Sequence, residues 1–267
     1  MKKIVFMYDF DETLCDSYAQ HKEFFRRLEL NPDNFWTQNH EDCKQSNTDV
    51  VLGYMYKFIE TAKRKNIVLN QQFLKECGEG ITFFKGVEEW FDRINDYGKK
   101  KGVEIEHYLI SCGIKELIEG SSIASKFKRI FANCYAYNEQ GEAYWLSQIV
   151  NFTTKTQYIF RIKKNLIDNL ADTKEINVKR SKDDQLPYTN MFYFGDGDTD
   201  IPCMKVVKDK GGRSVCVFDA DSQRKRATAM RILTDGRVNA VAEADYSEGS
   251  ALDLYVKKAI DRIAKNM

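Results

Sequence analysis

The sequence predicts an α/β fold, in which a doubly wound parallel sheet carries an inserted helical segment. Continuous apolar runs of strand length recur along the chain between polar turns, as in strands that are buried on both faces. Stretches with helical periodicity lie between the runs, which favours parallel pairing and a Rossmann-like sheet. No comparable apolar run occurs in residues 16–82, where the patterns are helical.

The four predicted strands of the central sheet are short and rich in β-branched and aromatic residues. A hairpin is also predicted within residues 131–146, because two aromatic-rich stretches flank the turn signal Asn-Glu-Gln-Gly. The four strand runs are residues 4–8, 107–110, 191–194 and 215–218.

Three helices of the sheet domain are predicted where apolar residues recur three and four positions apart. They cover residues 87–94, 158–170 and 252–263, and Ser250 is a candidate N-cap for the last. Residues 171–190 are polar and are predicted to form a surface excursion.

The segment before the second strand is predicted to form a separate helical unit. Its helical patterns lie at 24–28, 51–59 and 73–74, and Asn31-Pro32-Asp33 is predicted to break the first two apart. We therefore expect a sheet domain of residues 1–15 and 83–267 with a helical insert of residues 16–82. The ends of the insert, near 15–17 and 85–86, are predicted hinges.

Composition excludes several classes of protein. Of the 267 residues, 41 are Lys or Arg and 40 are Asp or Glu, so the net charge of +1 gives no reason to expect nucleic acid or an anionic membrane as partner. The apolar run at residues 4–8 is too short for a signal peptide, and no window approaches the ~18 apolar residues of a membrane span. Seven cysteines without a C-x-x-C pair fit a reducing compartment. We expect a soluble, cytoplasmic protein, and the sequence does not predict its oligomeric state.

Carboxylates follow two of the predicted strands. Asp9 and Asp11 come directly after the first strand, and Asp196 and Asp200 lie in the Gly-Asp-Gly-Asp-Thr-Asp sequence after the third. The carboxyl ends of parallel strands meet at one edge of the sheet, where such folds bind ligands. Carboxylates gathered there repel one another unless a cation neutralises them. Hard oxygen ligands with few histidines nearby indicate Mg²⁺ rather than zinc.

Two further positions indicate an anion site. The second strand ends in Ser111-Cys112-Gly113, which places a hydroxyl and free backbone N–H groups at the start of a helix. Lys155 begins another predicted helix, although the first helical turn normally favours acidic residues. An ordinary helix cap and a surface lysine are the structural alternatives.

The order of these motifs resembles that of the haloacid dehalogenase-like superfamily. The D-x-D-x-T sequence from Asp9, Ser111 after the second strand, Lys155 at a helix start and G-D-G-x-x-D after the third strand match its four motifs. The helical insert resembles a C1 cap, and the arrangement is most similar to the phosphoserine-phosphatase-like branch. Asp11 stands where the metal-free dehalogenases lack an acid.

The resemblance implies a phosphatase with an aspartyl-phosphate intermediate. It implies Asp9 as nucleophile and Asp11 as general acid and base. Ser111, the Gly113 N–H and Lys155 would bind the phosphoryl group. It implies Mg²⁺ as cofactor, held by Asp9, the Asp11 carbonyl and Asp196, with Asp200 supporting a metal-bound water or Lys155. Thr13 would fix the loop through its hydroxyl, a structural role, or contact substrate.

The substrate implied by this comparison is a small phosphorylated metabolite. A phosphotransferase that passes the phosphoryl group to an alcohol is one alternative, and a non-catalytic module that binds a phosphorylated ligand is another. The cap would select the leaving group, and residues 245–249 form a polar cluster that either reaches the cleft or simply leads into the last helix. The candidate cap residues are Glu23, Arg26, Arg27, Tyr54, Met55 and Lys57.

Overall fold

A seven-stranded sheet forms the centre of the computed structural model, which describes residues 2–181 and 183–266. The strand order is β4-β3-β2-β1-β5-β6-β7, and every neighbouring pair is parallel except the β3–β4 hairpin. The predicted doubly wound sheet and the hairpin are therefore confirmed. The strands are β1 Lys2–Tyr8, β2 Val103–Ile114, β3 Arg129–Tyr137, β4 Ala143–Gln148, β5 Met191–Gly195, β6 Arg213–Phe218 and β7 Ala240–Glu243.

The direction of winding reverses at the centre of the sheet. From β1 the chain passes to β2 and β3 on one side, whereas β5 continues to β6 and β7 on the other. In the register of the parallel pairs, Tyr8 lies opposite Leu109 of β2 and Phe194 of β5. The carboxyl ends of β1 and β5 thus lie side by side at the switch point, which is where open α/β sheets bind ligands.

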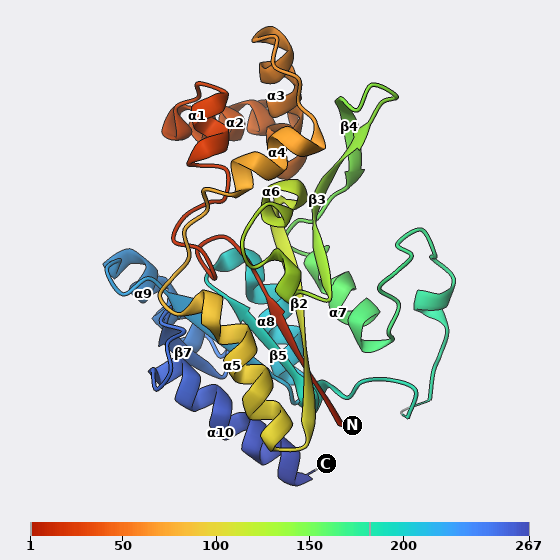
Figure 1. Cartoon of the computed structure of the whole chain (residues 1–267), viewed down its shortest axis with the longest axis vertical. Coiled ribbons are helices and arrows are strands. Elements are labelled where there is room, and N and C mark those ends of the chain that lie inside the picture. The colour runs from red at the N-terminus through yellow and green to blue at the C-terminus, as the bar shows by residue number, and fades with distance from the viewer. Residues whose placement is uncertain (1, 182, 267) are drawn as a thin grey trace.

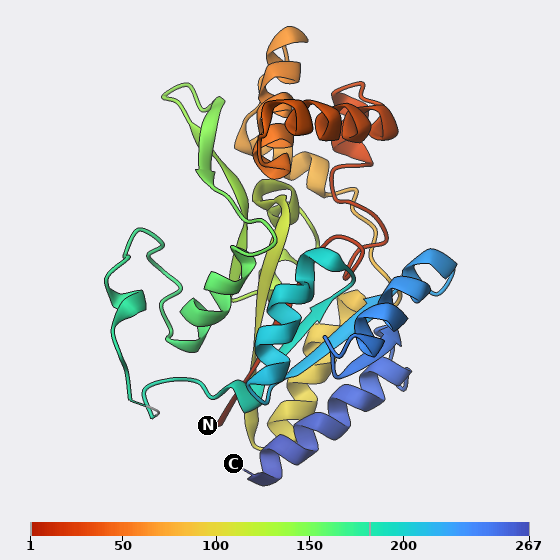
Figure 2. The ribbon, with the colours of Figure 1, turned by 180° about the vertical axis from the view of Figure 1, so that it is seen from behind.

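Side chains alternate between the two faces of β1, and each face has its own helical layer. Ile4, Phe6 and Tyr8 pack in the apolar core beneath α5 and α10, while Val5 and Met7 pack with α7, α8 and α9. Figures 1 and 2 show these layers from opposite sides. No helix of the described ranges is long and apolar enough to cross a membrane. The helices of the two layers are α5 Val87–Lys100, α7 Lys155–Lys163, α8 Ile201–Asp209, α9 Gln223–Thr234 and α10 Ala251–Asn266.

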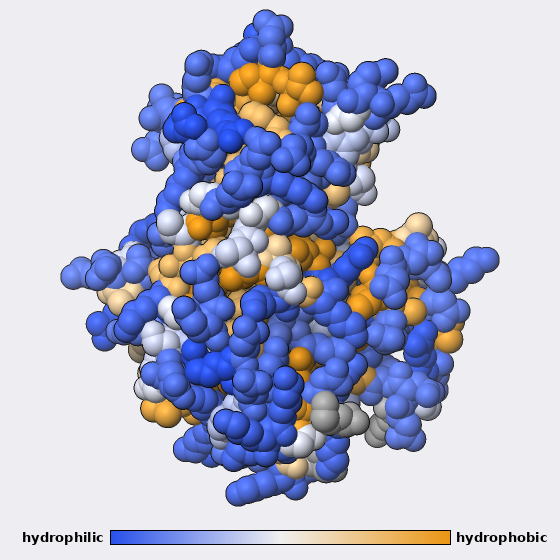
Figure 3. All heavy atoms as spheres, in the orientation of Figure 1, coloured by the Kyte–Doolittle hydropathy of each residue, from blue (hydrophilic) through white to orange (hydrophobic). Residues whose placement is uncertain are grey.

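Four helices stand above the carboxyl edge of the sheet and have an apolar core of their own (Figure 1). This core includes Phe24, Phe35 and Phe58, and it continues into Leu117 of the short helix α6 and Tyr135 of the hairpin. In the space-filling view the upper part narrows where it meets the body, and apolar side chains gather across that junction (Figure 3). The helices are α1 Glu23–Arg27, α2 Pro32–Ser46, α3 Val50–Arg64 and α4 Gln71–Gly78, and α6 is Lys115–Glu119.

Helix α2 is missing from the sequence-based prediction, which treated Asn31-Pro32-Asp33 only as a break. In the structure Pro32 is the first residue of a 15-residue helix. The side chain of Asn31 accepts a hydrogen bond from the backbone N–H of Asn34 at 3.0 Å. Proline fits the first helical position because its φ is already suitable and its missing N–H would have no intrahelical partner there. The tripeptide therefore ends one element and begins the next.

Helix α7 is shorter than predicted. It ends at Lys163, and Asn165 adopts a positive φ of 54°, so Leu166 and Leu170 lie beyond the helix. Residues 171–181 and 183–190 form the predicted surface excursion, with two short 3₁₀ turns.

The chain passes between the helical unit and the body through two adjacent segments outside the sheet. Cys15 and Phe83 form an antiparallel bridge, and the N–H of Phe84 donates to the carbonyl oxygen of Leu14 at 3.0 Å. The second predicted hinge lies beyond this crossing. A Cβ on Gly86 would meet the backbone N of Ser247 at 2.5 Å, and the residue has a φ of 78°, so the position requires glycine. Its role as a hinge stays a prediction.

We expect Gly78→Ala to weaken the contact between α4 of the helical unit and α6. A Cβ at Gly78 would lie 1.9 Å from the carbonyl oxygen of Leu117 in α6, so the two helices would have to separate. Overpacking of this kind costs ~1–3 kcal/mol of unfolding free energy. Urea denaturation followed by circular dichroism measures the loss.

Gly80→Ala is the matched control, because a Cβ there meets nothing closer than 3.7 Å. It should change the unfolding free energy by less than ~0.5 kcal/mol. Equal stability of the two variants would contradict the close α4–α6 contact.

Candidate active site

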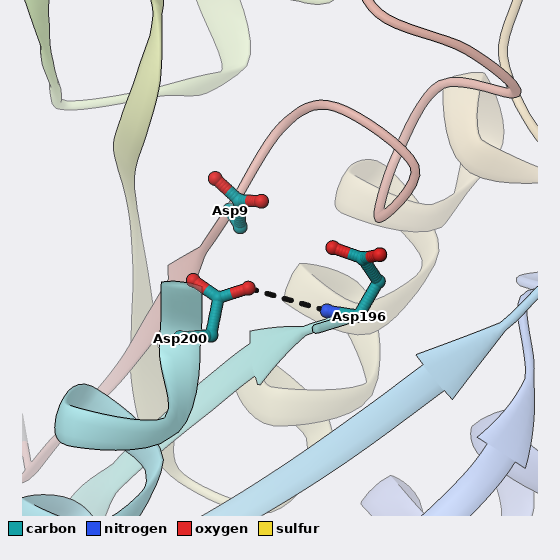
Figure 4. A group of neighbouring side chains, drawn as sticks. All are labelled: Asp9, Asp196 and Asp200. Atoms are coloured by element: carbon teal, nitrogen blue, oxygen red, sulfur yellow. Dashed lines mark hydrogen bonds between the residues drawn. The ribbon is translucent and has the colours of Figure 1, made fainter. Parts of the chain in front are cut away.

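Three carboxylates meet at the carboxyl edge of the sheet. Asp9 follows β1, Asp196 follows β5, and Asp200 ends the turn that leads into α8 (Figure 4). All three are buried, and one oxygen of each lies within 4.8 Å of those of the other two. The structure thus brings together residues almost two hundred positions apart in the sequence. Their positions after parallel strands predicted this proximity.

Lys155 is buried between two of these carboxylates. Its Nζ lies 2.8 Å from Oδ1 of Asp9 and 2.8 Å from Oδ1 of Asp200, and the side chain is completely buried. Asp200 also accepts hydrogen bonds from the hydroxyl of Tyr193 at 2.7 Å and from the backbone N–H of Asp196 at 3.3 Å. Both oxygens of Asp200 therefore have partners within the protein.

Burial and mutual repulsion disfavour the charged forms of the acids. Desolvation raises the pKa of Asp9 well above its usual value, and the charge of Asp200 adds to this effect. The same two causes raise the pKa of Asp196 to about 6. Burial alone would lower the pKa of Lys155, but Asp200 and Asp9 outweigh it and hold the pKa above its usual range.

The charges of the site leave room for a cation. Asp9, Asp196 and Asp200 offer closely spaced hard oxygens, and the two lysines that pair with them, Lys155 and Lys225, compensate only part of their negative charge. Such a donor set suits Mg²⁺, which prefers carboxylate oxygens. The residues present therefore fit the magnesium site that the sequence predicted. The carboxylate of Asp11 does not belong to this group of three.

Asp11 lies beside the cluster in a distinct environment. Its Oδ1 accepts a hydrogen bond from the backbone N–H of Ala19 at 2.7 Å. Burial raises its pKa to about 7, although that hydrogen bond acts in the opposite direction. A carboxyl group with such a pKa can give up and take back a proton near neutral pH.

A cavity of about 550 Å³ opens above the cluster. Its floor includes Asp9, Asp11, Lys155 and Asp196, whereas Asp200 lies behind the wall. Its roof comes from the helical unit and from the loop before α7. The lining residues from these two parts are Tyr18, Gln20, Trp36, Asn39, His40, Val50, Val51, Tyr54 and Phe152.

The predicted phosphate-binding residues of β2 sit deeper than expected. Ser111 is completely buried, and its hydroxyl accepts a hydrogen bond from the N–H of Gly113 at 2.8 Å. Cys112 lines the cavity, while Ser111 and Gly113 are not part of the lining. The hydroxyl of Thr13 is also buried and has no partner among the described residues, so the predicted loop-fixing hydrogen bond is absent there.

Most of the predicted cap residues point elsewhere. Of the six candidates, Tyr54 alone lines the cavity. Glu23 pairs with both Arg26 and Arg27, at 2.7 Å each, on the outer surface of α1. Lys57 pairs with Asp42 at 2.7 Å, and Met55 is part of the apolar core of the helical unit. These predictions were wrong because helical periodicity identifies a polar face but not which neighbour it meets.

Two charged residues of the floor were missed. Lys225, in the first turns of α9, lies 2.8 Å from Oδ2 of Asp196 and also pairs with Glu12. Glu12 itself adopts a positive φ of 57°, which turns the chain sharply after Asp11. Like Lys155, Lys225 is a cation near a helix start, which was the signal available in the sequence.

Residues 245–249 support the loop of Asp9 and Asp11 from behind. The hydroxyl of Tyr246 donates to the carbonyl oxygen of Thr13 at 2.9 Å. The backbone N–H of Tyr246 donates to the carbonyl oxygen of Lys85 at 2.8 Å. The segment does not contribute to the lining of the cavity.

Comparison with known proteins points to one fold. No family model matches the sequence. An uncharacterized protein of Borreliella burgdorferi is 26% identical over 285 residues, and the match covers 96% of each chain.

Several solved structures share the architecture. A HAD family hydrolase from Salmonella enterica serovar Typhi superposes with a TM-score of 0.58 at 14% identity, over 95% of this chain and 69% of that one. A substrate-bound phosphoserine phosphatase superposes with a TM-score of 0.54 at 15% identity, over 97% of this chain and 99% of that one. A phosphoserine phosphatase with an analogue of the phospho-aspartyl intermediate has a TM-score of 0.53 at 16% identity, and the match also covers 97% of this chain and 99% of that one. The chain therefore has the haloacid dehalogenase-like fold in its phosphoserine-phosphatase-like form.

Proposed function

We propose that this protein is a Mg²⁺-dependent phosphomonoesterase that hydrolyses a small phosphorylated metabolite through an aspartyl-phosphate. The observation that carries the proposal is the placement of Asp9 and Asp11 on the floor of one cavity with Lys155 and Asp196. The fold shared with solved phosphatases supports it. We also propose a cytoplasmic location, which the seven free cysteines support.

Asp9 acts as the nucleophile in this mechanism. Lys155 holds its Oδ1, so Oδ2 is the oxygen that attacks phosphorus. A bond forms between Oδ2 and phosphorus, and the bond between phosphorus and the ester oxygen breaks. Positive charge from Lys155 stabilises the transferring phosphoryl group.

Asp11 moves the proton. In its protonated form it donates to the departing ester oxygen, and in its ionised form it then accepts a proton from the water that attacks the aspartyl-phosphate. Its pKa of about 7 makes both forms accessible near neutral pH. The hydrogen bond from Ala19 fixes its orientation, and this bond joins the motif loop to the beginning of the cap.

Asp9, the backbone carbonyl of Asp11 and Asp196 would hold Mg²⁺, with Asp200 completing the acidic group. When bound, the ion supplies positive charge that offsets the repulsion between the carboxylates and a phosphate dianion. Asp200 contributes chiefly by holding Lys155 in place, since both of its oxygens are engaged within the protein. Ser111 and Gly113 could bind phosphate only if their mutual hydrogen bond is exchanged for one to the ligand.

We further propose that residues 16–82 form a cap that covers the reaction, with residues 1–15 and 83–267 as the catalytic core. The paired crossing at Cys15 and Phe83 supports this division. Closure of such a unit excludes water while the phosphoryl group transfers to Asp9.

Asp9→Asn should reduce turnover of phosphate esters by at least about a thousandfold, because an amide is a poor nucleophile toward phosphorus. Steady-state assay of phosphate release on an aryl phosphate measures the effect. Asp33→Asn, at an exposed position of α2, is the matched control and should keep the wild-type rate. Turnover by Asp9→Asn within about tenfold of wild type would exclude Asp9 as the nucleophile.

Removal of divalent cations should abolish activity, and Mg²⁺ should restore it. The reason is the excess of buried carboxylates over lysines around Asp9. Dialysis against EDTA followed by a Mg²⁺ titration measures activity, and calorimetry on the same samples measures binding directly. Asp196→Asn should weaken the calorimetric affinity. Full activity in excess EDTA would refute the metal-dependent mechanism.

A further inference from the structure

We propose that the roof of the cavity selects phosphate esters whose leaving group is an uncharged alcohol that carries a planar ring, with Gln20 as its polar contact. This inference rests on the proposed phosphatase function and concerns only the part of the substrate that departs. The roof consists of nine lining residues: Tyr18, Gln20, Trp36, Asn39, His40, Val50, Val51, Tyr54 and Phe152.

The roof lacks charged partners for an acidic or basic leaving group. Within the described chain, none of its residues is Lys, Arg, Asp or Glu, and its one histidine, His40, is exposed to solvent. A carboxylate or ammonium group placed there would lose water without gaining an opposite charge.

The described floor offers no unpaired lysine to replace such a partner. Lys225 is paired with Asp196 and Glu12, and Asp198 is paired with Arg231. Lys155 is held between its two carboxylates. The charges of the floor are thus paired with one another, except that of Asp11, which accepts a hydrogen bond from the N–H of Ala19 and serves proton transfer in the proposed mechanism.

Aromatic rings form much of the roof. Trp36 lies edge-to-face with Tyr54, their ring centroids 5.3 Å apart, and 5.9 Å from the ring of Tyr18. The indole N–H of Trp36 donates to Nε2 of His21 at 2.6 Å, so the surface that it offers a ligand is apolar. Phe152, from the loop before α7, also lines the cavity and stays 44% exposed. Rings arranged in this way favour contact with a flat ligand.

Gln20 is the polar exception. Its side chain is 97% buried, since only 3% is exposed, and its Oε1 has no hydrogen-bond partner among the described residues. The other lining amide, Asn39, donates to the carbonyl oxygen of Val50 at 3.1 Å and accepts from the thiol of Cys43. A buried acceptor without a partner is costly. Because Gln20 lines the cavity, a hydroxyl or ring N–H of the leaving group would satisfy its Oε1 once the amide turns toward the ligand.

A panel of synthetic esters tests this specificity. The probes are phenyl phosphate, its three hydroxyphenyl isomers, phosphoserine and phosphoethanolamine, each assayed for kcat/KM with Mg²⁺. We expect the best hydroxyphenyl phosphate to exceed phosphoserine and phosphoethanolamine by at least about tenfold. A wild-type preference for either charged aliphatic ester would overturn the inference while leaving the phosphatase proposal intact.

Gln20→Met tests the polar contact, because methionine has a similar length and no amide. The ratio of kcat/KM for the best hydroxyphenyl phosphate to that for phenyl phosphate should fall about fivefold to tenfold. Arg26→Ala is the cap control, since Arg26 is exposed and pairs only with Glu23 in the structure. It should leave every ratio unchanged. An unchanged ratio in Gln20→Met would exclude the contact.

A binding measurement separates this inference from the reaction. Hydroxyphenyl phosphate should quench the tryptophan fluorescence of Asp9→Asn, and the quenching should disappear when Trp36→Phe is added. If no ester is hydrolysed but this quenching is observed, the phosphatase proposal fails and the recognition of a ring stands. If neither turnover nor quenching occurs, both proposals fail.

Discussion

The ion triad of Lys155 with Asp9 and Asp200 is the interaction on which the rest of the site depends. All three side chains are almost completely buried, and both N–O distances are 2.8 Å. Removing one member would leave a buried charge without its partner, which is strongly destabilising. The triad also joins three separate elements, because Asp9 follows β1, Lys155 begins α7 and Asp200 precedes α8. The same contacts that orient the proposed nucleophile therefore also hold the end of β1 against the starts of α7 and α8.

The floor of the site was predictable because its residues depend on local features of the sequence. Asp9, Asp11, Asp196 and Asp200 each follow an apolar run that had to be a buried strand, and parallel strands bring their carboxyl ends together. Lys155 was identifiable as a cation at a helix start. The exact depth of Ser111 was not predictable, since β2 continues to Ile114 and the N–H of Gly113 bonds to the Ser111 hydroxyl within the strand.

The roof could not be predicted in the same way. Arg26 and Arg27 lie on a polar face of α1, but that face turns away from the cavity, where the two arginines pair with Glu23 and Glu76. Trp36 reaches the cavity from α2, a helix that the proline at its start concealed. Which face of a cap helix meets the cleft is decided by packing between α1, α2 and α3, and this information is not contained in the periodicity of any one helix.

The two sides of the cavity therefore contribute to the proposed function through different physical effects. The floor acts through buried charge, and Asp9, Lys155, Asp196 and Lys225 each have a partner of opposite sign that a phosphoryl group or a cation must join or replace. The roof acts through apolar surface, and Tyr18 and Phe152 at its rim remain 40% and 44% exposed. Covering these rings stabilises a complex only when a ligand with an apolar face fills the cavity. Such a ligand would therefore also favour the exclusion of water from the floor, where water would weaken the electrostatic interactions on which phosphoryl transfer to Asp9 depends.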